Sequence, residues 1–249
     1  MFCYSLTLYL LLHNFSTTMS IDYAQIDQLF DSDKHDESQK MLMEHYKDNE
    51  ESVELLWRLA RTMYFLSVDD KKKHKDAMYE GQKYAAKGHE LDPTNFECLR
   101  WASILTGSIS DISGQKEKIQ QGNLFKEYLD KALALQPDEF TLLHMSGRLA
   151  YSVANLTWIE RKLATTLYEA PPEGSMDEAI EKFQKVADLK PDWIENLLYL
   201  AKAFIGKSAK QYKSELAKVL KQCVELTPTN AADRQAQEEA KPLLKKYGS

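Results

Sequence analysis

The fold is decided by the stretch ALALQPDEFTLLHMSGRLA, residues 132–150, in which one proline separates two helix-like runs. On both sides of Pro137 the apolar residues recur three and four positions apart, which is the spacing of one helix face. A proline pushes the residue before it out of the α region and pre-sets φ for a new helix start. The stretch therefore predicts a helix that ends near residue 136 and a second helix directly after the turn.

The same arrangement recurs around four prolines: GHELDPTNFECL at Pro93, ALALQPDEFTLL at Pro137, VADLKPDWIENL at Pro191 and CVELTPTNAADR at Pro228. Successive prolines are 44, 54 and 37 residues apart. Tetratricopeptide repeats, in which each unit is an antiparallel helix pair, have a period of about 34 residues. The longer, irregular intervals indicate lengthened helices and insertions on the same scheme.

The repeats agree in the size of residues at matching positions. In the second helices one aligned position carries Ala85, Leu129, Phe183 and Leu220, which is a large residue in three of the four repeats. Three residues later, a second aligned position carries a smaller residue in each repeat: Gly88, Ala132, Val186 and Cys223. The first helices share a small residue: Ala60, Ser103, Gly147 and Ala201. Small residues let helices approach closely. The pattern predicts an all-α, tetratricopeptide-like, right-handed solenoid of antiparallel helix pairs with lengthened helices, and a generic helical bundle is the alternative.

The expected domain organisation is one helical-repeat domain over residues 20–249. It comprises a degenerate hairpin at 21–47, repeats at 52–91, 94–136, 138–190 and 193–226, and a polar capping helix at 230–247. Residues 1–18, MFCYSLTLYLLLHNFSTT, have an apolar run that is too short to span a bilayer. We expect them to be an optional hydrophobic extension that is disordered, cleaved or bypassed by an alternative start.

The composition argues for a binding protein and against an enzyme. The chain contains no phosphate-binding glycine loop, nucleophile elbow or metalloprotease motif, and none of its six histidines forms an i, i+4 pair. We therefore expect no catalytic residue, metal or cofactor. The three cysteines are isolated, as is typical of reduced thiols in a cytosolic protein. The net charge of −6 argues against non-specific binding of nucleic acid.

The first helix of each repeat is expected to line a concave groove. Projecting the groove-facing positions onto this chain places cations beside aromatic residues: Trp57, Arg61, Tyr64, Arg100, Ile104, His144, Arg148, Tyr151, Glu195, Leu198 and Lys202. Guanidinium and ammonium groups suit a carboxylate-rich or phosphate-bearing ligand. The alternative is that these cations pair with acids on neighbouring helices, as surface ion pairs commonly do.

The stretch GRLAYSVANLTWIERKLATTLYEAPPEG, residues 147–174, departs from an ordinary repeat. Its helical character runs on beyond one hairpin until Pro171, which predicts a single overlong helix. Trp158, Arg161 and Lys162 form a basic insert that either extends the groove wall or, for Trp158, fills space between repeats.

Three stretches together resemble the regulator of microtubule dynamics family: LWRLARTMYFLS (56–67), GHELDPTNFECLRWASILTGSISDISGQKEKI (88–119) and LLHMSGRLAYSVANLTWIERKLATTLYEAPP (142–172). The resemblance implies a non-enzymatic tetratricopeptide-like protein that associates with microtubules and spindle poles and acts in chromosome segregation. It also implies a cytoplasmic, cytoskeletal location. Some family members carry a clear membrane anchor, and its absence before Leu12 favours the soluble side of the family, closest to its first member.

Two partner hypotheses remain from the sequence. The first is tubulin, microtubules or another acidic protein segment, met by basic faces of the domain. The second is a phospholipid, or an adaptor role at contacts between organelle membranes.

Charge is distributed unevenly along the chain: residues 20–55 carry 11 acids and 3 lysines, a net of −8, whereas residues 202–249 carry 10 basic and 5 acidic residues, a net of +5. The oligomeric state is not indicated.

Overall fold

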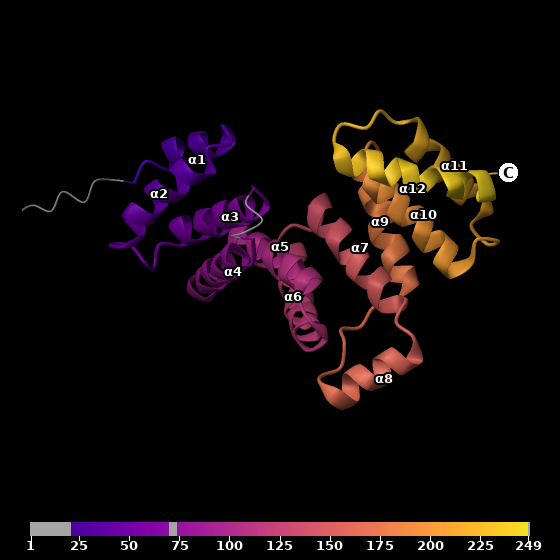
Figure 1. Cartoon of the computed structure of the whole chain (residues 1–249), viewed down its shortest axis with the longest axis horizontal. Coiled ribbons are helices and arrows are strands. Elements are labelled where there is room, and N and C mark those ends of the chain that lie inside the picture. Colours follow the sequence, from indigo (N-terminus) through magenta and orange to yellow (C-terminus); the bar gives the residue numbers. More distant parts are fainter. Residues whose placement is uncertain (1–20, 70–73, 249) are drawn as a thin grey trace, which may run out of the picture.

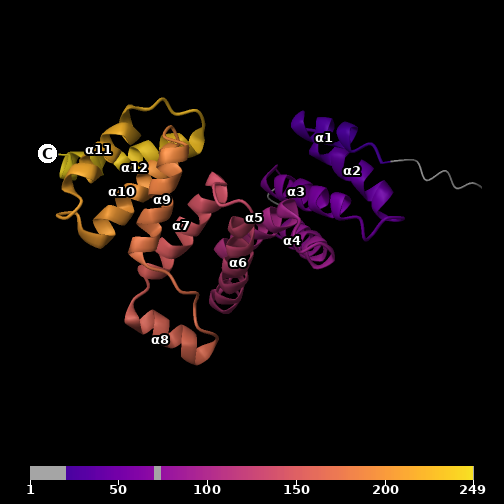
Figure 2. The ribbon, with the colours of Figure 1, turned by 180° about the vertical axis from the view of Figure 1, so that it is seen from behind.

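The computed structural model describes residues 21–69 and 74–248, and all regular secondary structure in these residues is helical. In chain order the helices are α1 (Tyr23–Asp31), α2 (His35–Tyr46), α3 (Val53–Asp69), α4 (His74–Leu91), α5 (Phe96–Ile112), α6 (Gln115–Leu135), α7 (Phe140–Ala154), α8 (Trp158–Leu167), α9 (Met176–Leu189), α10 (Ile194–Ser208), α11 (Lys213–Glu225) and α12 (Ala231–Tyr247). They follow one another from the α1–α2 end of the molecule to the α11–α12 end, and α8 projects to one side (Figures 1 and 2). The predicted all-α helical-repeat fold is confirmed, whereas the expected extension at 1–18 lies outside the described residues.

Three of the four proline turns start the next helix through a side-chain cap two residues further on, whereas Trp193, two residues after Pro191, makes no such hydrogen bond. Asn95 caps α5 by accepting a hydrogen bond from the backbone of Cys98, and Glu139 caps α7 by accepting one from Leu142. Asn230, two residues after Pro228, caps α12 in the same way. Because these side chains satisfy N–H groups that the helix leaves unpaired, each of these turns both ends one helix and stabilises the start of the next.

Two hydrophobic cores lie along the solenoid. The first is built by helices α1 to α6 and reaches Leu142 of α7, and the second joins α7 to helices α9 to α12. Helix α7 contributes to both, because Leu142 belongs to the first core and Ala150 to the second. The two halves of the molecule therefore meet at this helix.

Helices α7 and α9 approach closely because Gly147 has no side chain. A Cβ atom placed there would lie 2.7 Å from the ring of Phe183, which is completely buried in the second core. The small residue and the large ring thus fit together, which is the complementarity that the repeat pattern predicted.

We predict that Gly147→Ala destabilises the protein by about 1–3 kcal/mol, because the added methyl group overpacks the core against Phe183. Gly114 is the matched control, since a Cβ there meets nothing within 4 Å. Urea unfolding of both variants measures the difference. An equal, small effect of the two substitutions would show that the core accommodates the methyl group.

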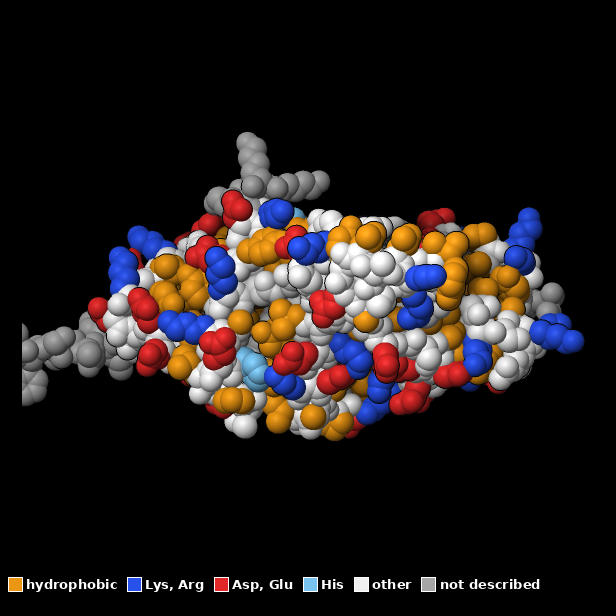
Figure 3. Space-filling model, turned by 90° about the horizontal axis from the view of Figure 1, so that it is seen from below, with side chains coloured by type: hydrophobic (Ala, Val, Ile, Leu, Met, Phe, Trp, Pro, Cys, Tyr) orange, Lys and Arg blue, Asp and Glu red, His pale blue; other side chains and the backbone are white. Residues whose placement is uncertain are grey.

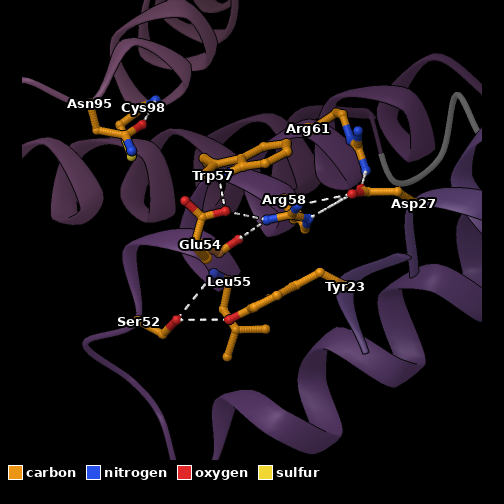
Figure 4. Close-up of polar contacts among 10 residues, drawn as sticks. All are labelled: Tyr23, Asp27, Ser52, Glu54, Leu55, Trp57, Arg58, Arg61, Asn95 and Cys98. Atoms are coloured by element: carbon orange, nitrogen blue, oxygen red, sulfur yellow. Dashed lines mark hydrogen bonds and ion pairs between the residues drawn. The ribbon is translucent and has the colours of Figure 1, made fainter. Parts of the chain in front are cut away.

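The N-terminal hairpin is attached to α3 by a charged cluster (Figure 4). Asp27 of α1 accepts hydrogen bonds from Arg58 at 2.9 Å and from Arg61 at 2.5 Å, and Glu54 accepts one from Arg58 at 2.5 Å. Burial raises the pKa of Asp27, but its hydrogen bonds with the two arginines outweigh this effect and hold the pKa below its ordinary value of 3.8. The ionised carboxylate is therefore the form that stabilises the hairpin.

We predict that Asp27→Asn lowers the free energy of unfolding by roughly 2 kcal/mol at neutral pH, because Arg58 and Arg61 lose their shared carboxylate. Since the folded pKa is depressed, the contribution of Asp27 is complete above about pH 3.8 and disappears as the pH falls through the folded value. The variant should therefore show a shallower loss of stability on acidification. Hydrogen exchange should locate the early opening in α1 and α2.

The expected overlong helix between Gly147 and Pro171 is wrong. Helix α7 ends at Ala154, and Thr157 starts the separate helix α8. The Thr157 side chain accepts a hydrogen bond from the backbone of Glu160, and the Glu160 carboxylate accepts one from the backbone of Thr157. This capping box nucleates a new helix, so the insert is a distinct element.

Two kinds of feature are absent from the described part of the chain. No helix in residues 21–69 and 74–248 combines the length and apolar character needed to cross a bilayer. Within the same residues no group of three or more histidine, cysteine or acidic side chains is arranged to hold a metal ion.

Candidate functional site

A cavity of about 510 Å³ lies where the two halves of the solenoid meet. Helices α3, α5, α6 and α7 contribute to its wall, and Trp193 and Glu195 close it from the start of α10. Its aromatic lining residues are Tyr64, Phe65, Trp101, Phe125 and Trp193. Aromatic and aliphatic side chains with a few polar groups at the edge are typical of a ligand site.

His144 is the most deeply buried polar residue of the cavity, with 3% of its surface exposed. Asn196 donates through Nδ2 to the backbone oxygen of Phe183, so its Oδ1 accepts a hydrogen bond from His144 Nδ1–H at 3.0 Å. The Nε2 atom of His144 is consequently an unprotonated acceptor, and it has no hydrogen-bond partner among the described residues. Burial lowers the pKa of His144 to about 4, which keeps the ring neutral at physiological pH.

Aromatic rings hold the imidazole of His144 in place. The Trp193 ring lies 4.4 Å from it, centroid to centroid, and Phe183 and Tyr199 lie at 5.5 and 5.6 Å. The indole Nε1–H of Trp101, another lining residue, also has no hydrogen-bond partner in the described part of the chain. Both unpaired atoms are buried within the lining of the cavity.

The rim of the cavity carries two cations and two acids. Arg148 lies 3.7 Å from the Glu195 carboxylate and is 42% exposed, so this pair is open to solvent and is weak. Lys118 and Asp111 are exposed at the same rim, and Lys118 has no ion pair among the described residues. Cationic groups are therefore available at the mouth, although its net charge is balanced.

The groove projection placed some residues in this cavity. Tyr64, His144 and Arg148 line it, together with Ile104 and Glu195. Burial raises the pKa of the Tyr64 phenol. The role of these residues in ligand binding stays a prediction.

The other projected residues lie elsewhere. Trp57 donates to Glu54 at 3.1 Å, Tyr151 packs edge to face on Tyr199 with ring centroids 6.0 Å apart, and Leu198 is buried in the second core. These three contacts are part of the packing of the solenoid.

The sequence left open whether the recurrent cations stay free or pair locally, and all four have acidic partners. The pairs are Arg61 with Asp27 at 2.5 Å, Arg100 with Glu97 at 3.6 Å, Arg148 with Glu195 at 3.7 Å and Lys202 with Glu239 at 2.6 Å. The alternative of local pairing thus describes them. Several partners are far apart in sequence, which is why spacing alone did not find them.

The basic insert, composed of Trp158, Arg161 and Lys162, lies on α8. The expectation that Trp158 fills space between repeats is wrong, because 72% of its surface is exposed. Arg161 instead points back and donates to the backbone oxygen of Val153, at the end of α7. Neither Trp158 nor Lys162 lines the cavity.

Sequence reasoning missed Trp101, Phe125 and Trp193 as cavity residues. Trp101 follows the projected Arg100, and Trp193 lies two residues after Pro191, so both lie next to positions that were considered. Phe125 comes from a second helix of a repeat, α6, which the groove rule does not include.

The architecture defines a tetratricopeptide-type helical-repeat protein. It is similar in fold to the solved MamA protein, with a TM-score of 0.55 at 17% identity over 86% of this chain and 90% of that chain. A thermophilic tetratricopeptide protein of Thermus thermophilus superposes with a TM-score of 0.56 at 15% identity, over 88% of this chain and 96% of that one.

A family model described as regulator of microtubule dynamics protein 1-3 matches residues 22–248, and the chain belongs to this family. It is 36% identical over 225 residues to regulator of microtubule dynamics protein 1 of Caenorhabditis elegans, covering 90% of this chain and 98% of that protein. It is 35% identical over 196 residues to regulator of microtubule dynamics protein 2 of Rattus norvegicus, of which it spans 47%. The resemblance stated from the sequence is confirmed.

We predict that His144 makes the protein less stable as the pH falls from about 6.5 to about 4, by roughly 3 kcal/mol in total. In that window the unfolded chain binds a proton on His144 that the folded protein excludes, so stability is complete above pH 6.5. Urea unfolding at pH 8, 6 and 5 measures the slope, and His144→Gln should flatten it. An unchanged slope in the variant would mean that the folded cavity accommodates the imidazolium.

Proposed function

We propose that this protein regulates microtubule dynamics by binding rather than by catalysis, and that the cavity between its two halves docks a segment of tubulin or of another protein on the microtubule. Membership of a family whose members carry the name regulator of microtubule dynamics supports this role. So does the position of the cavity on the inner helices α3, α5 and α7 of the solenoid, the surface with which helical-repeat proteins bind partners.

The chemistry of the cavity favours a segment with apolar and acidic side chains. The apolar part would contact the aromatic lining, and a carboxylate would lie near Arg148 and Lys118 at the rim. The aromatic lining of the cavity, with Arg148 and Lys118 at its rim, is the single observation that carries this assignment.

We predict that the full chain co-sediments with polymerised tubulin and that Arg148→Glu reduces the bound fraction several-fold. Binding should also weaken as salt is raised, because charges at the exposed rim are screened. The matched control is Lys202→Glu, which also reverses a half-exposed cation paired with a glutamate but lies outside the cavity. Absence of pelleting at low salt, or equal loss in both variants, would contradict docking in the cavity.

At the level of the cell, we propose a cytoplasmic protein at spindle microtubules and spindle poles that acts in chromosome segregation. The support is the likeness to family members, as given above. A fluorescently labelled full chain, imaged through mitosis beside its Arg148→Glu variant, tests this location. Diffuse signal for the unchanged protein throughout mitosis would argue against it.

A further inference from the structure

Helix α8 is amphipathic, yet its apolar side faces away from the protein. Ile159, Leu163 and Leu167 recur every four residues and are 61%, 52% and 62% exposed, and Trp158 beside them is 72% exposed. We call these four residues the α8 stripe. None of the residues of α8 is buried, and the side turned toward the fold carries only the half-buried Arg161 and Ala164. Helices normally bury this kind of stripe.

The stripe is held in a fixed orientation. The Thr157–Glu160 capping box starts the helix, and Arg161 binds the last turn of α7 through the backbone oxygen of Val153. The loop that follows is tied down as well, since Asn123 of α6 donates to the backbone oxygen of Ala170 at 3.1 Å. The outward direction of the stripe therefore follows from specific contacts.

Helix α8 projects beyond its neighbours α7 and α9 in both ribbon views (Figures 1 and 2), and the space-filling view from that side shows hydrophobic side chains exposed among basic and acidic ones (Figure 3). A projecting helix with an outward apolar stripe can reach a flat surface without a clash from the rest of the molecule. A groove-shaped partner is not required.

A second copy of this chain fits the stripe poorly. A two-fold antiparallel pair of α8 helices would bring each flank against its own copy, so that Lys162 meets Lys162 and Glu160 meets Glu160. The four side chains expose on the order of 400 Å², about half of the ~800 Å² that each partner buries in a standard protein interface. The charge therefore disfavours an antiparallel pair, and the small area disfavours any stable dimer through this helix alone.

We propose that α8 is a membrane-docking helix that lies in the interface of a lipid bilayer, with the α8 stripe inserted at the acyl boundary. Trp158 and Lys162 suit that boundary: the Lys162 ammonium lies 5.0 Å from the Trp158 ring, so its stem can follow the apolar surface while its charge stays at the head groups. The exposed Glu169 and Glu173 follow in the next loop and offset this cation, so insertion of apolar side chains dominates the binding. The α8 stripe is separate from the cavity, and membrane docking is a role additional to the proposed microtubule function.

Vesicle flotation of the full chain tests the proposal, with vesicles of phosphatidylcholine alone and of equal parts phosphatidylcholine and phosphatidylserine. The unchanged protein should float with both, and Ile159→Ser, Leu163→Ser and Leu167→Ser together should lower the partition coefficient at least about tenfold. The matched control changes three leucines of similar exposure at the ends of other helices, Leu91, Leu135 and Leu189, to serine and should leave binding unchanged.

Tryptophan fluorescence identifies the inserted element independently of residues 1–18, which contain no tryptophan. Vesicles with brominated acyl chains should quench the unchanged protein and quench the Trp158→Phe variant much less. Three results would overturn the proposal. They are equal quenching of the unchanged protein and the Trp158→Phe variant, equal flotation of the stripe and control variants, and failure of the unchanged protein to float. Sedimentation velocity showing a dimer that the stripe variant abolishes would overturn it as well. Tubulin pelleting of the stripe variant should be unaffected, which separates this result from the cavity hypothesis.

Discussion

The contact between Gly147 and Phe183 is the constraint on which the candidate site depends. Because Gly147 has no Cβ, the Phe183 ring packs directly against α7 and α9 lies close beside it. The backbone oxygen of Phe183 then orients Asn196, and Asn196 orients His144 at the cavity wall. The packing of Phe183 against Gly147 thus helps to determine which nitrogen of the buried His144 imidazole carries the proton.

Electrostatics in this protein act mainly within the molecule. The two arginines of α3 join the N-terminal hairpin to the first repeat through Asp27, and Lys202 joins α10 to the C-terminal helix through Glu239. These cations serve to hold the end elements of the solenoid in position. The recognition surface that remains is an apolar hollow with few polar atoms, and of the residues that the structure describes only Arg148 and Lys118 contribute positive charge at its edge.

Periodicity in the sequence was enough to predict the helices, the proline turns and the inner position of Tyr64, His144 and Arg148, because all of these follow from local spacing. It did not predict the ion pairs, since Arg61 and Asp27 are 34 residues apart. It also misled on Trp158. An amphipathic pattern states that a helix has an apolar side but does not state whether the protein covers that side, and here tertiary contacts such as those of Arg161 and Asn123 decide it. The break before α8 was readable, because Thr157 and Glu160 have capping-box spacing.

The loop around Gly174 explains how the repeat tolerates an inserted helix. A side chain at Gly174 would collide with the backbone of Ala150, 2.9 Å away, so the returning chain touches α7 close to Ala154, where it left that helix. The segment between α7 and α9, which contains α8, therefore begins and ends at nearly the same point in space. The superhelical path of the repeats continues as it would without this insertion. Such a closed detour can change in length or composition over evolutionary time without any adjustment of the repeats on either side.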